Sequence, residues 1–181
     1  NSTWRTTFDL HVKEENYANE IQELLLKLMT EGFHSPNNSL PYTYIQKKNC
    51  RRTHFLSTTL AKTLIEDFGK YSYAKCIPSW MLFGKLELSA KVLRGMWLGD
   101  GYFPSNRNWH FTTVSENLAY SMRLLLLRHG ISSSLEAKES YVDKNGVNHR
   151  KSYKVYVSQQ LAKQKLAQLL GIPYSQTIVG K

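Results

Sequence analysis

The stretch Leu93-Arg94-Gly95-Met96-Trp97-Leu98-Gly99-Asp100-Gly101 determines how the rest of this sequence is interpreted. Ser89, shortly before it, can cap a helix, since a serine side chain accepts hydrogen bonds from the free N–H groups at a helix start. The two glycines that lie four residues apart share one helical face, and each costs about 1 kcal/mol in a helix interior. We therefore expect another helix to approach this face closely. The aspartate ends the helix, and the last glycine turns the chain into a strand.

The sequence also repeats itself at an offset of 101 residues. Three blocks match in one register without a gap, which is hard to obtain by chance. The matches are Glu15-Asn16-Tyr17-Ala18 with Glu116-Asn117-Leu118-Ala119, Leu24-Leu25-Leu26-Lys27 with Leu125-Leu126-Leu127-Arg128, and Leu60-Ala61-Lys62 with Leu161-Ala162-Lys163. Self-similarity at a fixed spacing is typical of a duplicated structural unit, so we expect two copies of one module.

Each copy is predicted to form a strand, a helix, a hairpin and a second helix. Apolar residues alternate with polar ones in the expected strands and recur at helical spacing in the expected helices. In the second copy, Asn145-Gly146 is a strong hairpin-turn signal, and Ser115 can cap the first helix. The expected ranges are 5–12, 13–29, 40–57 and 58–68 in the first copy, and 108–114, 115–129, 132–158 and 159–170 in the second.

Leucine runs and tryptophans supply the expected hydrophobic core. We expect Leu24 to Leu26 and Leu124 to Leu127 to be buried, because leucine is among the residues most often found inside proteins. Trp80, Trp97 and Trp109 are expected to be packing residues as well.

The charge of the chain points to a polyanionic partner. Twenty-four Lys and Arg residues against fourteen Asp and Glu residues give a formal net charge of +10, and the pI is about 9.6. A hydrophobic content of 41% and an aromatic content of 12% are typical of a folded domain. Basic folded domains bind nucleic acid because phosphate contacts release counterions.

Several other classes of protein are disfavoured by the sequence. The apolar runs are too short to span a bilayer, and no segment has the build of a signal peptide. Cys50 and Cys76 form neither a disulfide framework nor a metal-spaced pair, and the histidines lack zinc-site spacing. We therefore expect no membrane partner and no secretion, but a cytoplasmic or nucleoid-associated protein, with an organelle as a further possibility.

The stretch that ends in Asp100-Gly101 resembles the LAGLIDADG motif of homing endonucleases, in the form common to the endonuclease domains of inteins. Lys75-Cys76-Ile77-Pro78 is similar to the lysine-isoleucine-proline block of that family, and Phe111-Thr112-Thr113-Val114-Ser115-Glu116 fits its strand-to-helix joint. Together with the duplication and the charge, the resemblance extends over nearly the whole chain.

The resemblance implies an α+β fold of two pseudo-symmetric αββαββα repeats that form a DNA-binding saddle. The two motif helices pack against each other, and strand residues alternate between the core and the DNA major groove. On this basis we expect a first repeat at 1–74, a linker at 75–88 and a second repeat at 89–181. The first repeat would lack its N-terminal helix and strand, since the repeat offset puts the counterpart of Asp100 just before Asn1.

The resemblance also implies a metal-dependent active site. Asp100 is the expected metal ligand and catalytic acidic residue, with Gly99 beside it at the metal, and Lys75 is the expected basic residue near the scissile phosphate. A second lysine is expected near position 176, where Gln176 stands, so Lys181 is the nearest candidate. The expected cofactor is Mg²⁺, as two or three divalent ions shared between the repeats, because hard cations take oxygen ligands.

Basic residues on or beside the expected strands are the candidates for contact with double-stranded DNA at a long recognition site. They are Arg5, His11, Arg107, His110, Lys138, Lys144, Arg150 and Lys154.

Two functions remain open at this stage. The first is a site-specific endonuclease that hydrolyses both strands of DNA, with its missing motif helix supplied by an upstream segment in cis or by a separate chain. The second is a catalytically inactive relative that binds nucleic acid, such as an intron maturase or a regulator. The host context can be an intein, an intron or a free-standing gene.

Overall fold

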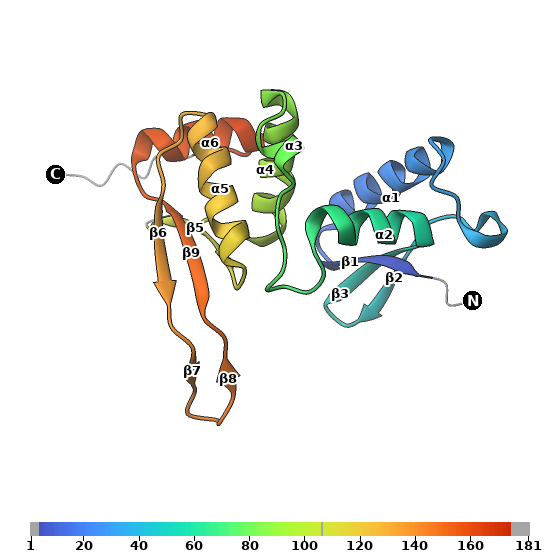
Figure 1. Cartoon of the computed structure of the whole chain (residues 1–181), viewed down its shortest axis with the longest axis horizontal. Helices are drawn as coiled ribbons and strands as arrows, with labels where there is room; N and C mark the ends of the chain where they lie inside the picture. The colour runs from blue at the N-terminus through green and yellow to red at the C-terminus, as the bar shows by residue number, and fades with distance from the viewer. Residues whose placement is uncertain (1–3, 106, 175–181) are drawn as a thin grey trace. The chain divides into compact units, whose positions relative to one another are not determined.

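The computed structural model describes residues 4–105 and 107–174 and shows a mixed α+β chain (Figure 1). The chain divides into two compact units, Asn1–Glu66 and Asp67–Lys181, which are described separately here. Residues 75–88, expected as a linker between two repeats, belong to the C-terminal unit. None of the helices within the described ranges is long and apolar enough to cross a membrane.

The N-terminal unit places two helices on one three-stranded antiparallel sheet. The strands are ordered β1-β3-β2, and α1 packs on β3 and β2. Phe55 and Leu25 are buried between the sheet and this helix, with Leu60 of α2 beside them. The elements are β1 Arg5–His11, α1 Glu15–Thr30, the short 3₁₀ helix η1 Pro36–Asn38, β2 Tyr42–Lys47, β3 Cys50–Leu56 and α2 Thr58–Phe68.

The C-terminal unit has a complete αββαββα order. Its main sheet is antiparallel with the strand order β4-β5-β9-β6. The elements are α3 Ser79–Leu82, α4 Leu86–Asp100, β4 Gly101–Tyr102, β5 Trp109–Thr113, α5 Glu116–Arg128, β6 Ser134–Lys138, β7 Tyr141–Val142, β8 Asn148–His149, β9 Ser152–Val157 and α6 Gln160–Leu170. The N-terminal unit matches the last five main elements of this order, and its described residues contain no counterpart of α4 and β4.

The core of the C-terminal unit lies between the main sheet and helices α4, α5 and α6 (Figure 1). Trp97 of α4 and Leu126 of α5 are fully buried, and so are Val155 and Val157 of β9. The pleat of a strand sends alternate side chains to opposite faces, so the same strands present a second row of side chains away from the helices. That second face is the part of the sheet that is free to contact a ligand.

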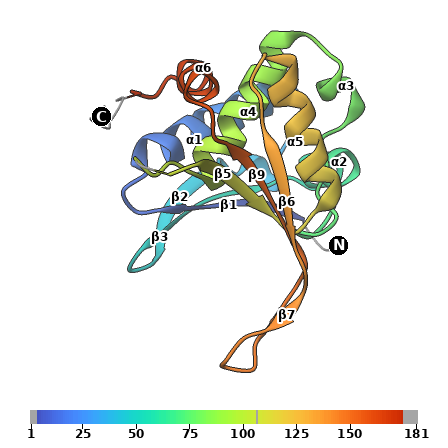
Figure 2. The ribbon, with the colours of Figure 1, turned by 90° about the vertical axis from the view of Figure 1, so that its left-hand side faces the viewer.

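A long hairpin extends beyond the main sheet of the C-terminal unit (Figure 2). After β6 the chain continues into β7, turns at residues 143–147, and returns through β8 into β9. Gly146 has a φ of +78°, a conformation that glycine adopts without steric cost, so the predicted Asn145-Gly146 turn is confirmed.

Helix boundaries follow the predictions closely, with one exception at the start of α4. The helix begins at Leu86, and Ser89 lies inside it instead of capping it. The buried Ser89 hydroxyl donates a hydrogen bond of 2.8 Å to the Leu86 carbonyl oxygen and lies 2.8 Å from His129 Nε2. The predicted cap at Ser115 is confirmed, since its Oγ accepts a hydrogen bond from the Leu118 N–H.

The expectation that whole leucine runs are buried was wrong. Leu25 is buried, but its neighbours Leu24 and Leu26 are 55% and 37% exposed, and Leu127 is 67% exposed. Consecutive residues of a helix point in directions about 100° apart, so a run of leucines cannot face one core. Trp80 is likewise exposed, whereas Trp97 and Trp109 are packed inside as expected.

The third matching block of the repeat corresponds only in part in its packing. Leu60 is buried, whereas Leu161, its partner in the sequence match, is 63% exposed. One residue separates β3 from α2, but two residues separate β9 from α6. Ala61 and Ala162, each five residues after the last strand residue, are both buried, so the block corresponds at the alanine and not at the leucine.

Candidate nucleic-acid interface

The face of the C-terminal sheet that points away from the helices is polar and aromatic. Phe111 and Val155 point into the core, so their strand neighbours His110, Thr112 and Lys154 lie on the opposite face. The register places Thr112 opposite Lys154, and Lys154 opposite Glu136 of β6. Two of the predicted DNA contacts, His110 and Lys154, are therefore on one surface.

An aromatic row crosses this polar face beside the end of α4. Tyr102 and His110 are paired in the register, and their rings are 5.0 Å apart. His110 is also paired with Tyr156, at a ring distance of 5.5 Å. Burial, and a hydrogen bond to Glu136, raise the pKa of Tyr156 above its usual value. Flat rings and hydrogen-bonding groups on a sheet surface are suited to contact with nucleic acid bases.

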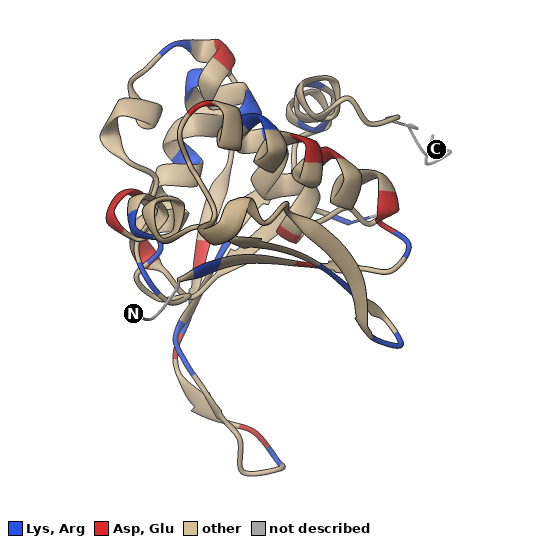
Figure 3. Cartoon of the chain, turned by 90° about the vertical axis from the view of Figure 1, so that its right-hand side faces the viewer, with Lys and Arg blue, Asp and Glu red and all other residues tan. Residues whose placement is uncertain are grey.

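The hairpin carries further predicted contacts (Figure 3). Lys144 is exposed at its tip, next to Asp143. The Asp143 Oδ1 accepts the N–H groups of Asn145 and Val147, and Oδ2 lies 3.1 Å from His149 Nε2. The hydrogen bond to His149 holds the pKa of Asp143 below its usual range. The tip is thus held in one shape by a carboxylate that stays charged.

Aromatic rings hold two other predicted contacts in place. Lys138 Nζ lies 3.9 Å from the ring centre of Tyr141, and the Arg150 guanidinium lies 4.7 Å from that of Tyr73. Arg107 is exposed in the loop between β4 and β5, and its carbonyl accepts a hydrogen bond from Lys163.

The sheet of the N-terminal unit also has a polar face. Arg5 and His11, both predicted contacts, are exposed on alternate positions of β1. The His11 ring is fixed at the start of α1, since its Nδ1 accepts the Lys13 N–H at 3.2 Å. Arg52 of β3 lies on the same face, as does the buried His54, and neither was predicted as a DNA contact. Only the strand pairing identifies them, because the side chains on either side of Arg52 are polar as well.

Asp100 is exposed at the carboxyl end of α4, directly before β4. The last carbonyl groups of a helix lack partners within the helix and carry partial negative charge. No basic residue lies in the last turn of α4, so nothing in the helix itself neutralises this end. The Asp100 carboxylate and the exposed Gly99 carbonyl region therefore form a negative site at the edge of the polar face.

Gly101 allows the strand to leave the helix in a tight turn. A Cβ built on Gly101 would lie 3.0 Å from Trp97 Cε3 and 3.0 Å from Phe103 Cζ, and closer still to the Trp97 carbonyl oxygen. Gly95 and Gly99 differ, because a Cβ at either would meet no atom within 4 Å. The face of α4 that carries them is open in this unit.

Lys75 is held near the carboxyl end of β5, the end toward which the register of β4 directs Asp100. Its carbonyl oxygen accepts a hydrogen bond of 2.5 Å from Ser115 Oγ, the cap of α5, and its side chain is exposed. Ile77, two residues on, is buried in the core. Gly101 pairs with Phe111, four residues before Ser115, so Lys75 and Asp100 are placed beside one strand. Lys181 lies outside the described residues.

Within the described ranges, no three His, Cys, Asp or Glu side chains gather into a group that could hold a metal ion. Mg²⁺ commonly keeps several waters and uses one or two carboxylates together with substrate phosphates, so its site does not require such a group. Asp100 fits that description as one carboxylate ligand.

Comparisons with known proteins agree with this geometry. Residues 87–172 match the family model of a LAGLIDADG-like domain. A 147-residue stretch, 76% of this chain, is 30% identical to an uncharacterized protein of Methanocaldococcus jannaschii, MJ1054, and covers 15% of it. A 95-residue stretch, 49% of this chain, is 35% identical to the ATP-dependent DNA helicase Hel308 of Thermococcus kodakarensis and covers 8% of it. The chain thus spans only a small part of both relatives.

Solved structures of the homing endonuclease I-DmoI have the same fold. Its complex with DNA and Mn is similar with a TM-score of 0.66 and 12% identity, covering 96% of this chain and 85% of that one. Its complex with DNA and Ca gives a TM-score of 0.65 at 12% identity, covering 94% and 76%. Residues 87–172 therefore match a LAGLIDADG-like domain, and the chain has the α+β fold of the homing endonuclease I-DmoI.

Proposed function

We propose that this protein binds double-stranded DNA with the polar faces of its sheets and hydrolyses phosphodiester bonds with a divalent metal held at Asp100. The observation that carries the proposal is the position of this carboxylate. It lies at the end of α4, immediately before the strand that places Tyr102 on the polar face. A metal ligand at the edge of a basic and aromatic surface is suited to a phosphate of bound DNA.

The charge and the strand pattern support duplex DNA as the partner. The net charge of +10 favours a polyanion, and strand side chains such as His110 and Lys154 are spaced for base edges and phosphates in a major groove. I-DmoI, which has the same fold, has been solved in complex with DNA. The predicted preference is for a long duplex, with Lys144 and Arg150 of the hairpin extending the contact along it.

Asp100 and the carbonyl of Gly99 would hold the metal, which we propose is Mg²⁺ in the functional state. A divalent ion there would offset negative charge on the phosphate and lower the pKa of a bound water. The negative carboxyl end of α4 attracts a cation, and no basic side chain in its last turn competes for Asp100. Lys75, fixed through its carbonyl to the cap of α5, would place a positive charge near the same phosphate.

We further propose that the open Gly95 and Gly99 face of α4 receives a second helix of the same kind. Glycines without neighbours in a helix interior are unfavourable by themselves and allow a close backbone approach. An upstream segment in cis, or a separate chain, would provide this helix and a second acidic residue. Cleavage of both strands then requires that assembly, whereas duplex binding does not.

The first test measures duplex binding as a function of salt. Binding of a long duplex should weaken steeply, because log affinity falls by about 0.9 per log unit of salt for each neutralised phosphate. A flat response to salt would contradict duplex binding. Preference for structured RNA over duplex DNA would instead indicate a maturase-like function.

The second test concerns Asp100. In an assembly that includes the second helix, Asp100→Asn should abolish Mg²⁺-dependent cleavage of at least one strand and leave duplex affinity unchanged, because the carboxylate contacts no base. Glu87→Gln, at the other end of α4, is the matched control and should cut normally. Normal cleavage of both strands by the Asp100→Asn variant would refute the assignment.

A further inference from the structure

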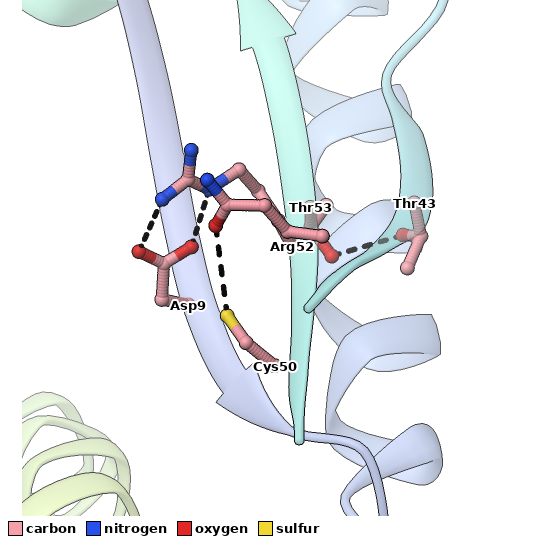
Figure 4. Close-up of polar contacts among 6 residues, drawn as sticks. Asp9, Thr43, Cys50, Arg52 and Thr53 are labelled. Atoms are coloured by element: carbon pink, nitrogen blue, oxygen red, sulfur yellow. Dashed lines mark hydrogen bonds and ion pairs between the residues drawn. The ribbon is translucent and has the colours of Figure 1, made fainter. Parts of the chain in front are cut away.

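A charged row crosses the polar face of the N-terminal sheet (Figure 4). The strand register places Asp9 of β1 opposite Arg52 of β3, and Arg52 opposite Tyr44 of β2. Side chains paired in this way on one face of a sheet are close enough to interact. The row therefore joins all three strands of the unit.

The Arg52 guanidinium is fixed by two parallel hydrogen bonds. Its Nε donates to Asp9 Oδ1 at 2.5 Å, and one terminal nitrogen donates to Asp9 Oδ2 at 2.7 Å (Figure 4). Tyr44 is paired with Arg52 on the side away from Asp9. The hydrogen bond from Arg52 holds the pKa of Asp9 below its usual value, so the pair stays ionised at neutral pH. A bidentate pair of this kind fixes the plane and direction of the guanidinium.

The guanidinium still has donors to offer. It carries five N–H groups, of which two donate to Asp9, so at least two remain for another partner. The side chains of Arg52 and Asp9 are 24% and 50% exposed, so the pair faces solvent on the polar side of the sheet. Two free donors on a fixed plane match the O6 and N7 acceptors of guanine in the major groove.

We propose that Arg52 recognises a guanine in the half of the DNA site bound by the N-terminal unit, and that Asp9 is the residue that positions it; this rests on the proposed function. A phosphate is a poorer partner for Arg52, because the adjacent Asp9 carboxylate cancels its charge and repels another anion. The guanine edge is neutral, so a contact with it depends on the direction of the N–H donors and not on net charge. A purely structural role is weak by comparison, since exposed ion pairs contribute little to stability.

Arg51 provides a matched control next to Arg52. It lies on the opposite face of β3, where its guanidinium is 3.4 Å from Glu15 of α1. An arginine that faces the helix layer cannot contact a base that lies on the polar face. Replacing either arginine with glutamine removes the same charge from adjacent positions of one strand.

The experiment selects binding sites from a library of random duplex DNA, with the full chain and with EDTA present so that no strand is cut. Wild-type protein should enrich a motif with at least one preferred guanine. Arg52→Gln should lose the preference at one position, by roughly 5- to 150-fold in relative affinity for guanine over other bases, and Arg52→Lys should reduce it. Lysine keeps the charge and can still donate to guanine but loses the fixed bidentate geometry, so a phosphate contact would be unchanged in Arg52→Lys and a guanine contact would be weakened.

Two further variants complete the design. Arg51→Gln should keep the whole motif. Asp9→Asn should reduce the preference for the same guanine while affinity for duplexes in general stays equal or rises, because a negative charge has been removed from the interface. A merely structural role of the pair would change the unfolding midpoint and leave the motif as it is.

The outcomes separate this inference from the proposed function. If the wild-type chain enriches no duplex motif, DNA recognition itself fails and the inference with it. If the wild-type chain enriches a motif, and Arg52→Lys and Arg52→Gln keep every guanine preference, only the assignment of Arg52 is overturned.

Discussion

At the scale of the residue, Asp100 occupies a helix end that disfavours a carboxylate. The carboxyl end of a helix carries partial negative charge, which costs an exposed acidic side chain roughly 0.3–1 kcal/mol. The last turn of α4 has no basic residue to offset it. The same arrangement becomes favourable when a divalent cation is bound, so the local electrostatics support a cation-binding role for Asp100.

The passage from α4 to β4 depends on the missing side chain of Gly101. Gly101→Ala should destabilise the chain by about 1–3 kcal/mol, because the added methyl group overlaps Trp97 and Phe103 in a packed region. Gly99→Ala is the control two residues earlier. Its methyl group meets open space in this unit, so the change should be neutral or raise stability by up to about 1 kcal/mol. Urea unfolding of both variants would check this, and equal effects would contradict it.

His129 makes the stability of the C-terminal unit depend on pH. Burial, and secondarily the charge of Arg128, lower its pKa in the folded protein below the ordinary value of 6.5. The unfolded chain therefore binds this proton more readily, and stability falls as the pH drops below about 6.5. His54 in the other unit has a lowered pKa as well, so wild-type unfolding alone does not separate the two.

The His129→Gln variant isolates this contribution. When the pH is lowered from about 7.5 to about 5, the thermal unfolding midpoint should fall less in the variant than in the wild type. An identical pH dependence in both proteins would show that His129 does not contribute.

The sequence was sufficient to place Asp100 at a helix end, but it did not indicate the position of Arg52. A glycine-flanked aspartate at a predicted helix end is a local pattern, and Ser115 was likewise predictable as a cap. The role of Arg52 depends on its pairing with Asp9, which is 43 residues away in the chain. Such a register is set by sheet geometry, and shifting it by one residue would turn Arg52 to the other face.

At the scale of the element, the β7–β8 hairpin places the proposed DNA contact at its tip away from the hydrophobic core. It continues β6 and β9 beyond the part of the sheet that the helices cover (Figure 2). The Asn-Gly turn was predictable, but the interruptions before β7 and after β8 were not. At these interruptions Lys151 and Glu139 form an ion pair of 2.8 Å, and Arg150 packs on Tyr73. The first contact joins the two arms of the hairpin, and the second reaches Tyr73, which lies far from the hairpin in the sequence.

Lys144 at the tip of this hairpin should contact a phosphate. Lys144→Gln should weaken binding to all duplexes alike and reduce the slope of log affinity against log salt by about 0.9. Lys62→Gln is the control, because Lys62 is exposed on α2, in the helix layer of its unit. Fluorescence anisotropy at several salt concentrations measures both slopes. A change of sequence preference without a change of slope would show that Lys144 reads a base instead.

At the scale of the whole molecule, two units of related element order have unequal cores. The C-terminal unit buries a large set of residues around Trp97 and Phe111, whereas the N-terminal unit centres on Leu25, Phe55 and Leu60. The order of strands and helices was predictable in both, because each element has its own periodicity. Which leucines are buried was not, since that depends on how each helix is rotated against its sheet.

The most direct test of the account measures metal binding in the complex with DNA. Electron paramagnetic resonance can follow Mn²⁺ binding to the chain bound to its selected duplex, with the duplex alone as background. The wild-type complex and the Glu87→Gln control should bind Mn²⁺ above background, because Asp100 and a DNA phosphate together supply oxygen ligands. Asp100→Asn should lose this binding while its duplex affinity stays the same. Unchanged Mn²⁺ binding by the Asp100→Asn complex would contradict the assignment of Asp100 as the metal ligand.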